Sequence, residues 1–154
     1  MFYHYTPAYR AAMIISSGIL QPSTIGLIES DTPYIWLSSN DQKDQTATIG
    51  SKMVATMLGK SAIRQVRFAY PGTDPIPYAK LKIRYLHRKM LERKANGSIP
   101  SQWYGLPGTL RLEQITLQDR INGQWETIDN SKLISEFTKA EFSMIDGKVF
   151  FQLV

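Results

Sequence analysis

Hydrophobic and polar positions change their spacing several times along the chain, and each change predicts a boundary between elements. Residues 2–6 combine aromatic and polar side chains in a pattern that predicts a short strand. Residues 9–14 then carry apolar side chains at helical spacing. Because Thr6-Pro7 suits a helix start and Gly18 suits a helix end, we predict a helix between them. Residues 33–39 predict a second strand, so the chain begins as strand, helix, loop and strand.

The middle of the chain alternates helix and strand patterns. Residues 51–58 predict a helix, and residues 62–70 predict a strand that stops at Pro71-Gly72. After a proline-rich loop at residues 73–77, apolar residues recur at helical spacing. The pattern predicts a long helix over residues 78–95, with a buried stripe at Ala79, Ile83, Leu86 and Met90.

The last third of the chain has mainly strand patterns. Residues 103–108 contain Trp, Tyr, Gly and Pro and predict a loop before the first of these strands. Strand patterns at residues 109–117 and 124–128 then flank Asn122-Gly123, a dipeptide typical of a tight hairpin.

The C-terminal residues predict a short helix and one more hairpin. The helix is expected over residues 131–137, and Asp146-Gly147 separates strand patterns at residues 142–145 and 148–153. Helices interrupt strands early and strands dominate late, which indicates an α+β fold. We therefore expect a single domain over residues 1–154.

Composition narrows the class of protein. The chain has 154 residues, of which 43% are hydrophobic and 20% charged, as in an ordinary globular domain. No apolar run approaches the roughly 20 residues that span a bilayer, so we expect a cytoplasmic protein that makes no membrane contact. The absence of cysteine excludes disulfides and thiolate chemistry. With two histidines in the chain, we expect no metal site.

The net charge of +5 comes largely from the region between Lys60 and Arg93, where cations crowd the predicted helix over residues 78–95. Tyrosine and histidine side chains are interleaved with its cations. Two interpretations stay open, a solvated helix face or a surface that binds the phosphates of nucleic acid. In the second interpretation the binding residues are Lys80, Arg84, Arg88 and Lys89.

Two short motifs resemble those of a known enzyme family. Tyr3-His4-Tyr5-Thr6 resembles the Tyr-His-Gly-Thr strand that opens the catalytic domain of diphtheria-type ADP-ribosyltransferases. Residues 34–38 resemble the second motif of that family, Gly-Ile-Tyr-Phe-Ala/Ser, and the segment that begins at Ser51-Lys52 resembles the helix after it. The resemblance extends over about the first sixty residues. It implies split antiparallel sheets around a cleft for NAD, with helices at the periphery.

The resemblance also implies which residues bind NAD, the substrate that supplies the ADP-ribose. His4 matches the histidine that hydrogen-bonds the adenosine ribose, and Thr6 accompanies it. Trp36 stands where the family has the tyrosine that stacks on nicotinamide, and Ser38 completes that motif. An indole ring can also stack and donate a hydrogen bond, so the substitution is compatible with NAD binding.

A catalytic carboxylate is the third expectation. Breaking the nicotinamide bond develops positive charge on the ribose, and a fixed carboxylate in a water-poor site can stabilise that charge. Glu113 is the best match, because residues 113–117 start a strand in a way similar to the family's glutamate-bearing strand, and we expect it to act together with His4. Glu126 and Glu136 remain alternatives.

Three functions stay open from the sequence. The first is an NAD-dependent ADP-ribosyltransferase, such as a bacterial or phage toxin, that modifies a nucleic acid or protein acceptor and has an antitoxin partner. The second is a non-catalytic nucleotide-binding module of the same fold, which the tryptophan at position 36 permits. The third is a basic nucleic-acid-binding or assembly protein that acts through residues 78–95.

Overall fold

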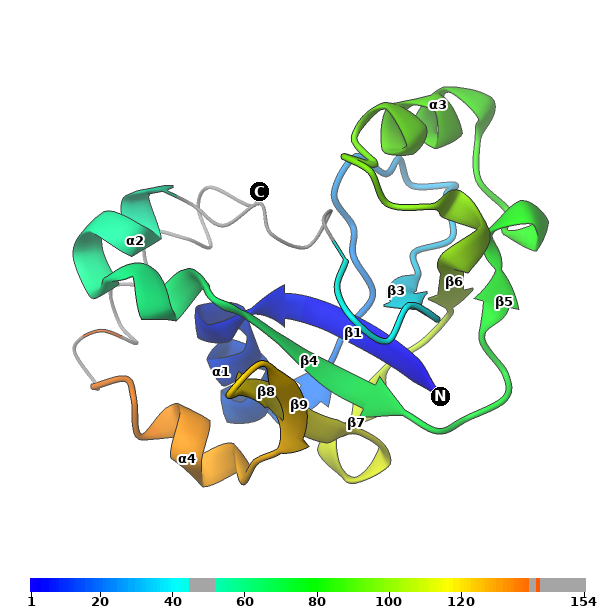
Figure 1. Cartoon of the computed structure of the whole chain (residues 1–154). Coiled ribbons are helices and arrows are strands. Elements are labelled where there is room, and N and C mark those ends of the chain that lie inside the picture. Colours follow the sequence, from blue (N-terminus) through cyan, green and yellow to red (C-terminus); the bar gives the residue numbers. More distant parts are fainter. Residues whose placement is uncertain (45–51, 139–140, 142–154) are drawn as a thin grey trace.

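The structure is a mixed α+β fold built around one antiparallel sheet (Figure 1). The computed structural model describes residues 1–44, 52–138 and 141. In that part of the chain the main sheet has the strand order β5-β6-β3-β1-β4-β8-β9. Its strands are β1 Phe2–Pro7, β3 Ile35–Ser38, β4 Gln65–Tyr70, β5 Ile76–Pro77, β6 Trp103–Leu106, β8 Thr116–Ile121 and β9 Gln124–Thr127.

A two-stranded sheet and several helices surround the main sheet. The small sheet pairs β2 (Ile19–Leu20) with β7 (Leu110–Arg111). The α-helices of the described residues are α1 Ala8–Ser17, α2 Lys52–Leu58, α3 Tyr85–Arg93 and α4 Asn130–Ile134. Short 3₁₀ turns lie at Lys60–Ile63, Tyr78–Lys80, Pro100–Gln102 and Leu112–Gln114. None of the described helices is long and apolar enough to cross a bilayer. The antiparallel main sheet and the α-helices around it confirm the α+β architecture expected from the sequence.

Helix α1 covers one face of the main sheet. Its Ala8 and Ala11 pack against Val66 and Phe68 of β4 and Leu117 of β8, all of them buried. Small alanine side chains let the helix approach the sheet closely, while the branched and aromatic residues fill the space between the two layers. Apolar packing on this face fixes the register of the central strands.

Two local predictions, one at a helix end and one at a turn, are confirmed. Gly18 ends α1 in the left-handed conformation with φ 84°, and its N–H donates to Ile14 O and Ile15 O. Asn122 and Gly123, with φ 52° and 80°, form the tight turn between β8 and β9. The start of α1 differs, because Thr6 and Pro7 continue β1 and the helix begins at Ala8.

The long basic helix predicted over residues 78–95 is wrong in its first half. Tyr78 and Leu81 are buried with Tyr34 and Trp103, and this packing pulls the backbone out of helical geometry before α3. The expected buried stripe is correspondingly broken, since Leu86 is 73% exposed. Tertiary contacts of two large side chains have overridden helical periodicity here.

The loop predicted over residues 103–108 is also wrong. Residues Trp103–Leu106 form β6, which pairs with β3 on one side and β5 on the other. Gly105 fits in this strand because Leu81 and Tyr34 lie directly over it. An added Cβ would be 2.8 Å from Leu81 Cδ2, so the glycine permits a close approach that a sequence pattern does not reveal.

The strand predicted over residues 109–117 is divided into three elements. Leu110–Arg111 pair with β2, Leu112–Gln114 form a 3₁₀ turn, and the next strand of the main sheet begins at Thr116. The Gln114 side-chain oxygen accepts from Arg111 N at 2.9 Å and closes the turn. Glu113 therefore lies on a surface turn and not on a strand. The hairpin expected around Asp146-Gly147 lies outside the described residues.

Candidate functional site

Strands β1 and β3 touch over a short length and then separate. Their register contains one pair, Tyr3 with Ser38, whereas β1 pairs with β4 along its whole length from Phe2 to Pro7. Just beyond the single pair, His4 Nδ1 lies 2.9 Å from Trp36 O. The two motifs that the sequence singled out are therefore neighbours, and a side-chain hydrogen bond joins them where the strands diverge. Figure 1 labels β1 and β3, the strands that carry these motifs.

The hydrogen bond of His4 fixes its tautomer. A carbonyl oxygen can only accept, so Nδ1 carries the proton and donates to Trp36 O. Burial lowers the pKa of His4, a shift that this hydrogen bond and the nearby charge of Asp44 partly oppose. The ring is consequently neutral at pH 7, and its Nε2 presents a lone pair that can accept from a hydroxyl group.

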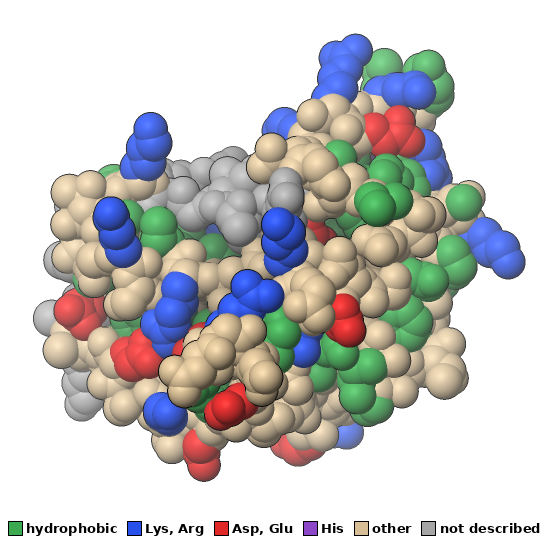
Figure 2. All heavy atoms as spheres, in the orientation of Figure 1, with side chains coloured by type: hydrophobic (Ala, Val, Ile, Leu, Met, Phe, Trp, Pro, Cys, Tyr) green, Lys and Arg blue, Asp and Glu red, His purple; other side chains and the backbone are tan. Residues whose placement is uncertain are grey.

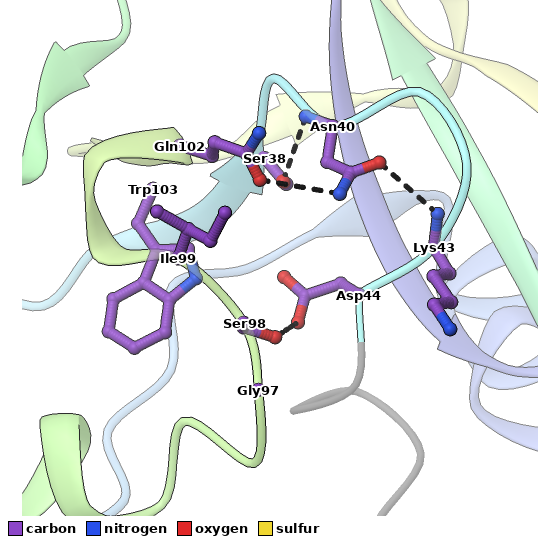
Figure 3. Close-up of a pocket in the computed structure, with 9 residues that line it drawn as sticks. All are labelled: Ser38, Asn40, Lys43, Asp44, Gly97, Ser98, Ile99, Gln102 and Trp103. Atoms are coloured by element: carbon purple, nitrogen blue, oxygen red, sulfur yellow. Dashed lines mark hydrogen bonds between the residues drawn. The ribbon is translucent and has the colours of Figure 1, made fainter.

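A small polar cavity of about 60 Å³ lies next to Ser38 (Figure 3). One wall comes from β3 and the loop after it, and the other from the residues that lead into β6. The lining residues are Ser38, Asn40, Lys43, Asp44, Gly97, Ser98, Ile99, Gln102 and Trp103.

Hydrogen bonds across this polar cavity hold its two walls together. Ser98 Oγ donates to Asp44 Oδ1 at 3.0 Å, and Asn40 Nδ2 donates to Gln102 Oε1 at 3.3 Å. Figure 3 shows the Asp44 carboxylate facing Ser98 across the opening. Because the same carboxylate also acts on the pKa of His4, it lies within electrostatic range of the place where β1 and β3 diverge.

A buried arginine supports the loop that forms one wall of the polar cavity. Arg67 is 5% exposed, and its Nη1 donates to Asp41 O at 2.6 Å and to Tyr5 Oη at 3.1 Å. Its Nε donates to Gln118 Oε1 at 2.7 Å. Tyr5 Oη in turn donates to Asn40 O. Arg67 and Tyr5 together fix the backbone at residues 40–41, which positions the polar side chains that follow.

A second and larger cavity, of about 230 Å³, lies between α3 and the loop before β3. Apolar side chains dominate its walls, and Trp36 and Tyr34 contribute aromatic rings. His87 of α3 is 8% exposed and lines this apolar cavity. The full set of lining residues is Ser23, Ile25, Leu27, Asp31, Thr32, Tyr34, Trp36, Lys82, Ile83, Arg84, His87, Met90, Leu91 and Lys94.

The residues expected to bind NAD are only partly brought together. Ser38 lines the polar cavity, and Trp36 lines the apolar cavity. Thr6 is buried opposite Val66 in the β1–β4 register and lines neither cavity. His4 touches the Trp36 backbone at the divergence of the strands. The four motif residues are therefore not gathered in one cavity.

The glutamates considered from the sequence lie away from both cavities. Glu113 has 82% of its side-chain surface exposed, and its contact with Arg111 is a loose ion pair at 4.0 Å. Glu136 is bound to Arg64 at 2.8 Å, and Glu126 stands opposite Asp119 in the β8–β9 hairpin. None of the three lines the polar or the apolar cavity. The carboxylate that does line the polar cavity is Asp44.

Two of the four cations expected to bind nucleic acid have internal partners. Arg84 pairs with Asp31 at 2.8 Å, and Arg88 donates to Tyr78 O and Leu81 O. Lys80 is exposed at the end of a 3₁₀ turn, and Lys89 lies 3.6 Å from Glu92. Figure 2 shows blue side chains gathered over the α3 end of the molecule. Part of the basic charge is structural there, and the rest is available to solvent.

Sequence reasoning missed Asp44, Ser98 and Arg67. Asp44 and Ser98 meet across the polar cavity although 54 positions separate them in the sequence. No local pattern predicts such a pair. Arg67 could have been suspected, because a cation inside an otherwise apolar strand pattern needs polar partners if it is buried. Among residues 1–44, 52–138 and 141, no cluster of His, Asp and Glu could hold a metal ion.

No protein-family model, curated protein or solved structure matches this chain. Functional inference therefore rests on the geometry of the two cavities and on the motifs around His4 and Trp36.

Proposed function

We propose that this chain is an ADP-ribosyltransferase-like domain that binds NAD where β1 and β3 diverge. The observation that carries the proposal is the hydrogen bond between His4 Nδ1 and Trp36 O, which joins the two motifs that resemble the family. Ser38 of the second motif lines the polar cavity, whose wall also includes the carboxylate of Asp44.

The chemistry of His4 suits the recognition of a ribose. A neutral imidazole with its proton on Nδ1 can accept at Nε2 from a ribose hydroxyl. Because the Nδ1 bond to Trp36 O holds the ring orientation, His4 does not lose much side-chain freedom when a ligand binds. His4 is therefore proposed as the ribose contact, and Ser38 as a polar contact in the adjoining cavity.

Asp44 replaces Glu113 in our proposal as the carboxylate of the reaction. When the bond between ribose and nicotinamide breaks, its electron pair leaves with nicotinamide and positive charge develops on the ribose. An acceptor hydroxyl or amine then bonds to the ribose and releases its proton. Asp44 can stabilise the positive charge, because Ser98 orients its carboxylate toward the polar cavity. Glu113 is too exposed for that role.

The test combines NAD binding with nicotinamide release. Calorimetry on the purified protein measures the affinity for NAD, and chromatography follows free nicotinamide with and without DNA, RNA or protein extract. We expect His4→Ala to weaken NAD binding by about tenfold. Asp44→Asn should lower nicotinamide release by about 10²-fold or more while NAD still binds. Glu113→Gln is the matched control and should keep the wild-type rate.

Each alternative outcome has a distinct meaning. Wild-type release by Asp44→Asn together with loss of release by Glu113→Gln would overturn the assignment of Asp44 and restore Glu113. Binding of NAD without release in any mixture would identify the non-catalytic module of the same fold, which the tryptophan at position 36 favours. A protein that does not bind NAD would refute the proposal.

A further inference from the structure

The apolar cavity between α3 and the loop before β3 has the properties of a ligand site that is separate from the polar cavity. We propose that it binds one nucleotide unit, with the base against Trp36 and His87 and the phosphate at Lys82 and Lys94. The inference goes beyond the proposed function, because it depends on neither Ser38 nor Asp44.

The size of the apolar cavity suits one ring system. Its volume is about 230 Å³, and a cavity of about 150 Å³ in another protein accommodates benzene. A base is larger than benzene and still small enough to enter. Trp36 and Tyr34 present aromatic rings at one wall, and Met90 and Leu91 of α3 supply apolar contacts at another. Stacking on such rings is tolerant of base identity.

His87 supplies the polar recognition that a base needs. His87 as a whole residue is 8% exposed, and its ring lines the apolar cavity without a hydrogen bond to another residue that the structure describes. Burial, followed by the charge of Arg84, lowers the pKa of His87, so the imidazole is neutral at pH 7. A neutral imidazole has one donor and one acceptor, and the edges of bases carry both kinds of group. No buried side-chain nitrogen or oxygen of the described residues lacks a hydrogen-bond partner, so the unpaired ring nitrogens of His87 are accessible from the cavity, where a ligand can bond to them.

Two lysines at the apolar cavity remain available for a phosphate. Lys82 and Lys94 are exposed, and neither forms an ion pair within the described part of the chain. Arg84, by contrast, is committed to Asp31, and that ion pair ties α3 to the loop on the other side of the opening. The cavity therefore has an aromatic and apolar interior, one interior hydrogen-bonding group and a basic rim. A nucleotide unit matches all three features.

Such a unit could be a free nucleotide or one residue of a single strand, and the experiment separates the two sources. The probes are adenosine and uridine 5′-monophosphate, measured by calorimetry, and a fluorescently labelled 12-nucleotide single-stranded DNA or RNA, measured by anisotropy. Equal affinity for a monophosphate and an oligonucleotide identifies a free-nucleotide site. Tighter binding of the oligonucleotide, with affinity that falls as salt rises, identifies a nucleic-acid surface.

Four variants test which residues bind the probe. We expect Trp36→Leu and His87→Ala each to weaken binding by about tenfold. The double substitution of Lys82 and Lys94 by alanine should weaken binding at low salt and flatten its salt dependence. Lys132→Ala, which removes an exposed lysine from α4, is the matched control and should bind as the wild type does. His87→Gln keeps a donor and an acceptor and should recover part of the loss.

The proposal is overturned if no probe binds, or if binding is the same in Trp36→Leu, His87→Ala and the wild type. Circular dichroism on every variant separates a lost contact from a lost fold, and His87→Gln keeps the test decisive if His87→Ala fails to fold. Loss of probe binding in Trp36→Leu and His87→Ala assigns the probes to the apolar cavity, whereas loss of NAD binding in His4→Ala assigns NAD to the place where β1 and β3 diverge. A failure of NAD binding at the polar cavity therefore remains distinguishable from a failure at the apolar cavity.

Discussion

The guanidinium carbon of Arg67 lies 3.8 Å from the centroid of the Tyr3 ring. The Trp125 ring lies 4.4 Å from the same carbon, so a buried cation rests between two aromatic faces. No carboxylate pairs with Arg67 in the part of the chain that the structure describes. Its charge is compensated by ring quadrupoles, a carbonyl oxygen, a tyrosine hydroxyl and a glutamine oxygen.

We expect Arg67→Met to lower the free energy of unfolding by about 2–4 kcal/mol, because several buried acceptors lose their donor at once. Urea denaturation followed by fluorescence measures the change. Arg120→Met is the control, because Arg120 also lies over the Trp125 ring but is exposed. Its guanidinium donates to one backbone carbonyl within the described residues, that of Gln42. An equal loss in the two variants would contradict the special contribution of Arg67.

Gly105→Ala should destabilise the fold by about 1–3 kcal/mol through overpacking. The new methyl group would lie 2.8 Å and 2.9 Å from the two terminal carbons of Leu81. A double-mutant cycle with Leu81→Ala checks the cause, because the shortened side chain leaves room for the methyl group. We expect the double variant to be more stable than the sum of the single losses predicts. Strict additivity would show that Leu81 is not the residue that clashes.

Both histidines should titrate below the ordinary pKa of 6.5. Burial lowers the pKa of His4 and of His87 in the folded chain. Between each lowered pKa and 6.5 the unfolded chain binds protons that the folded chain does not, so the folded state is favoured as the pH rises through this interval. The stabilisation is complete above pH 6.5 and is lost as the pH falls through the folded pKa. NMR titration of the two Hε1 signals, assigned with His4→Gln, measures both midpoints; a midpoint above 6.5 would contradict the prediction.

Arg64 joins two acidic residues from different elements. It binds Asp119 of β8 at 2.9 Å and Glu136 at 2.8 Å. Arg64→Met should lower the free energy of unfolding by about 1–2 kcal/mol at pH 7, because two carboxylates lose a shared cation. Salt screens partly exposed ion pairs, so the difference between variant and wild type should shrink as the salt concentration rises. Denaturation at low and at high salt measures it, and a difference that does not depend on salt would indicate lost packing alone.

Elements set by short-range chemistry were predictable from the sequence. Gly18 and Asn122-Gly123 determine their own conformations through positive φ angles, and the structure follows them. The order of strand, helix and strand in the first forty residues was also predictable, because local patterns of hydrophobic and polar residues indicate each element. Residues 78–84 and β6 could not be predicted, because their geometry depends on Leu81 and Tyr34 closing over Gly105 from distant parts of the chain.

The candidate site was likewise predictable from the sequence only in part. The two motifs indicated that His4 and Trp36 belong to one site, and the structure joins them by a hydrogen bond. Ser38 of the second motif lines the polar cavity. The position of Glu113 depended on an uninterrupted strand, and the 3₁₀ turn at Leu112–Gln114 removed that premise. No local sequence pattern singles out Asp44, because its position in the site depends on Ser98, which lies on the far wall of the polar cavity.

The short contact between β1 and β3 has a mechanical consequence. Tyr3 with Ser38 is the one registered pair that joins the β5-β6-β3 half of the described sheet to its β1-β4-β8-β9 half through these strands. Amide protons along this seam should exchange with solvent sooner than those between β1 and β4, because less backbone pairing must open. A ligand that contacts His4 of β1 and Ser38 of β3 would span both halves. Its binding would slow amide hydrogen exchange in both halves together. The exchange rates of the whole sheet would then report whether the site is occupied.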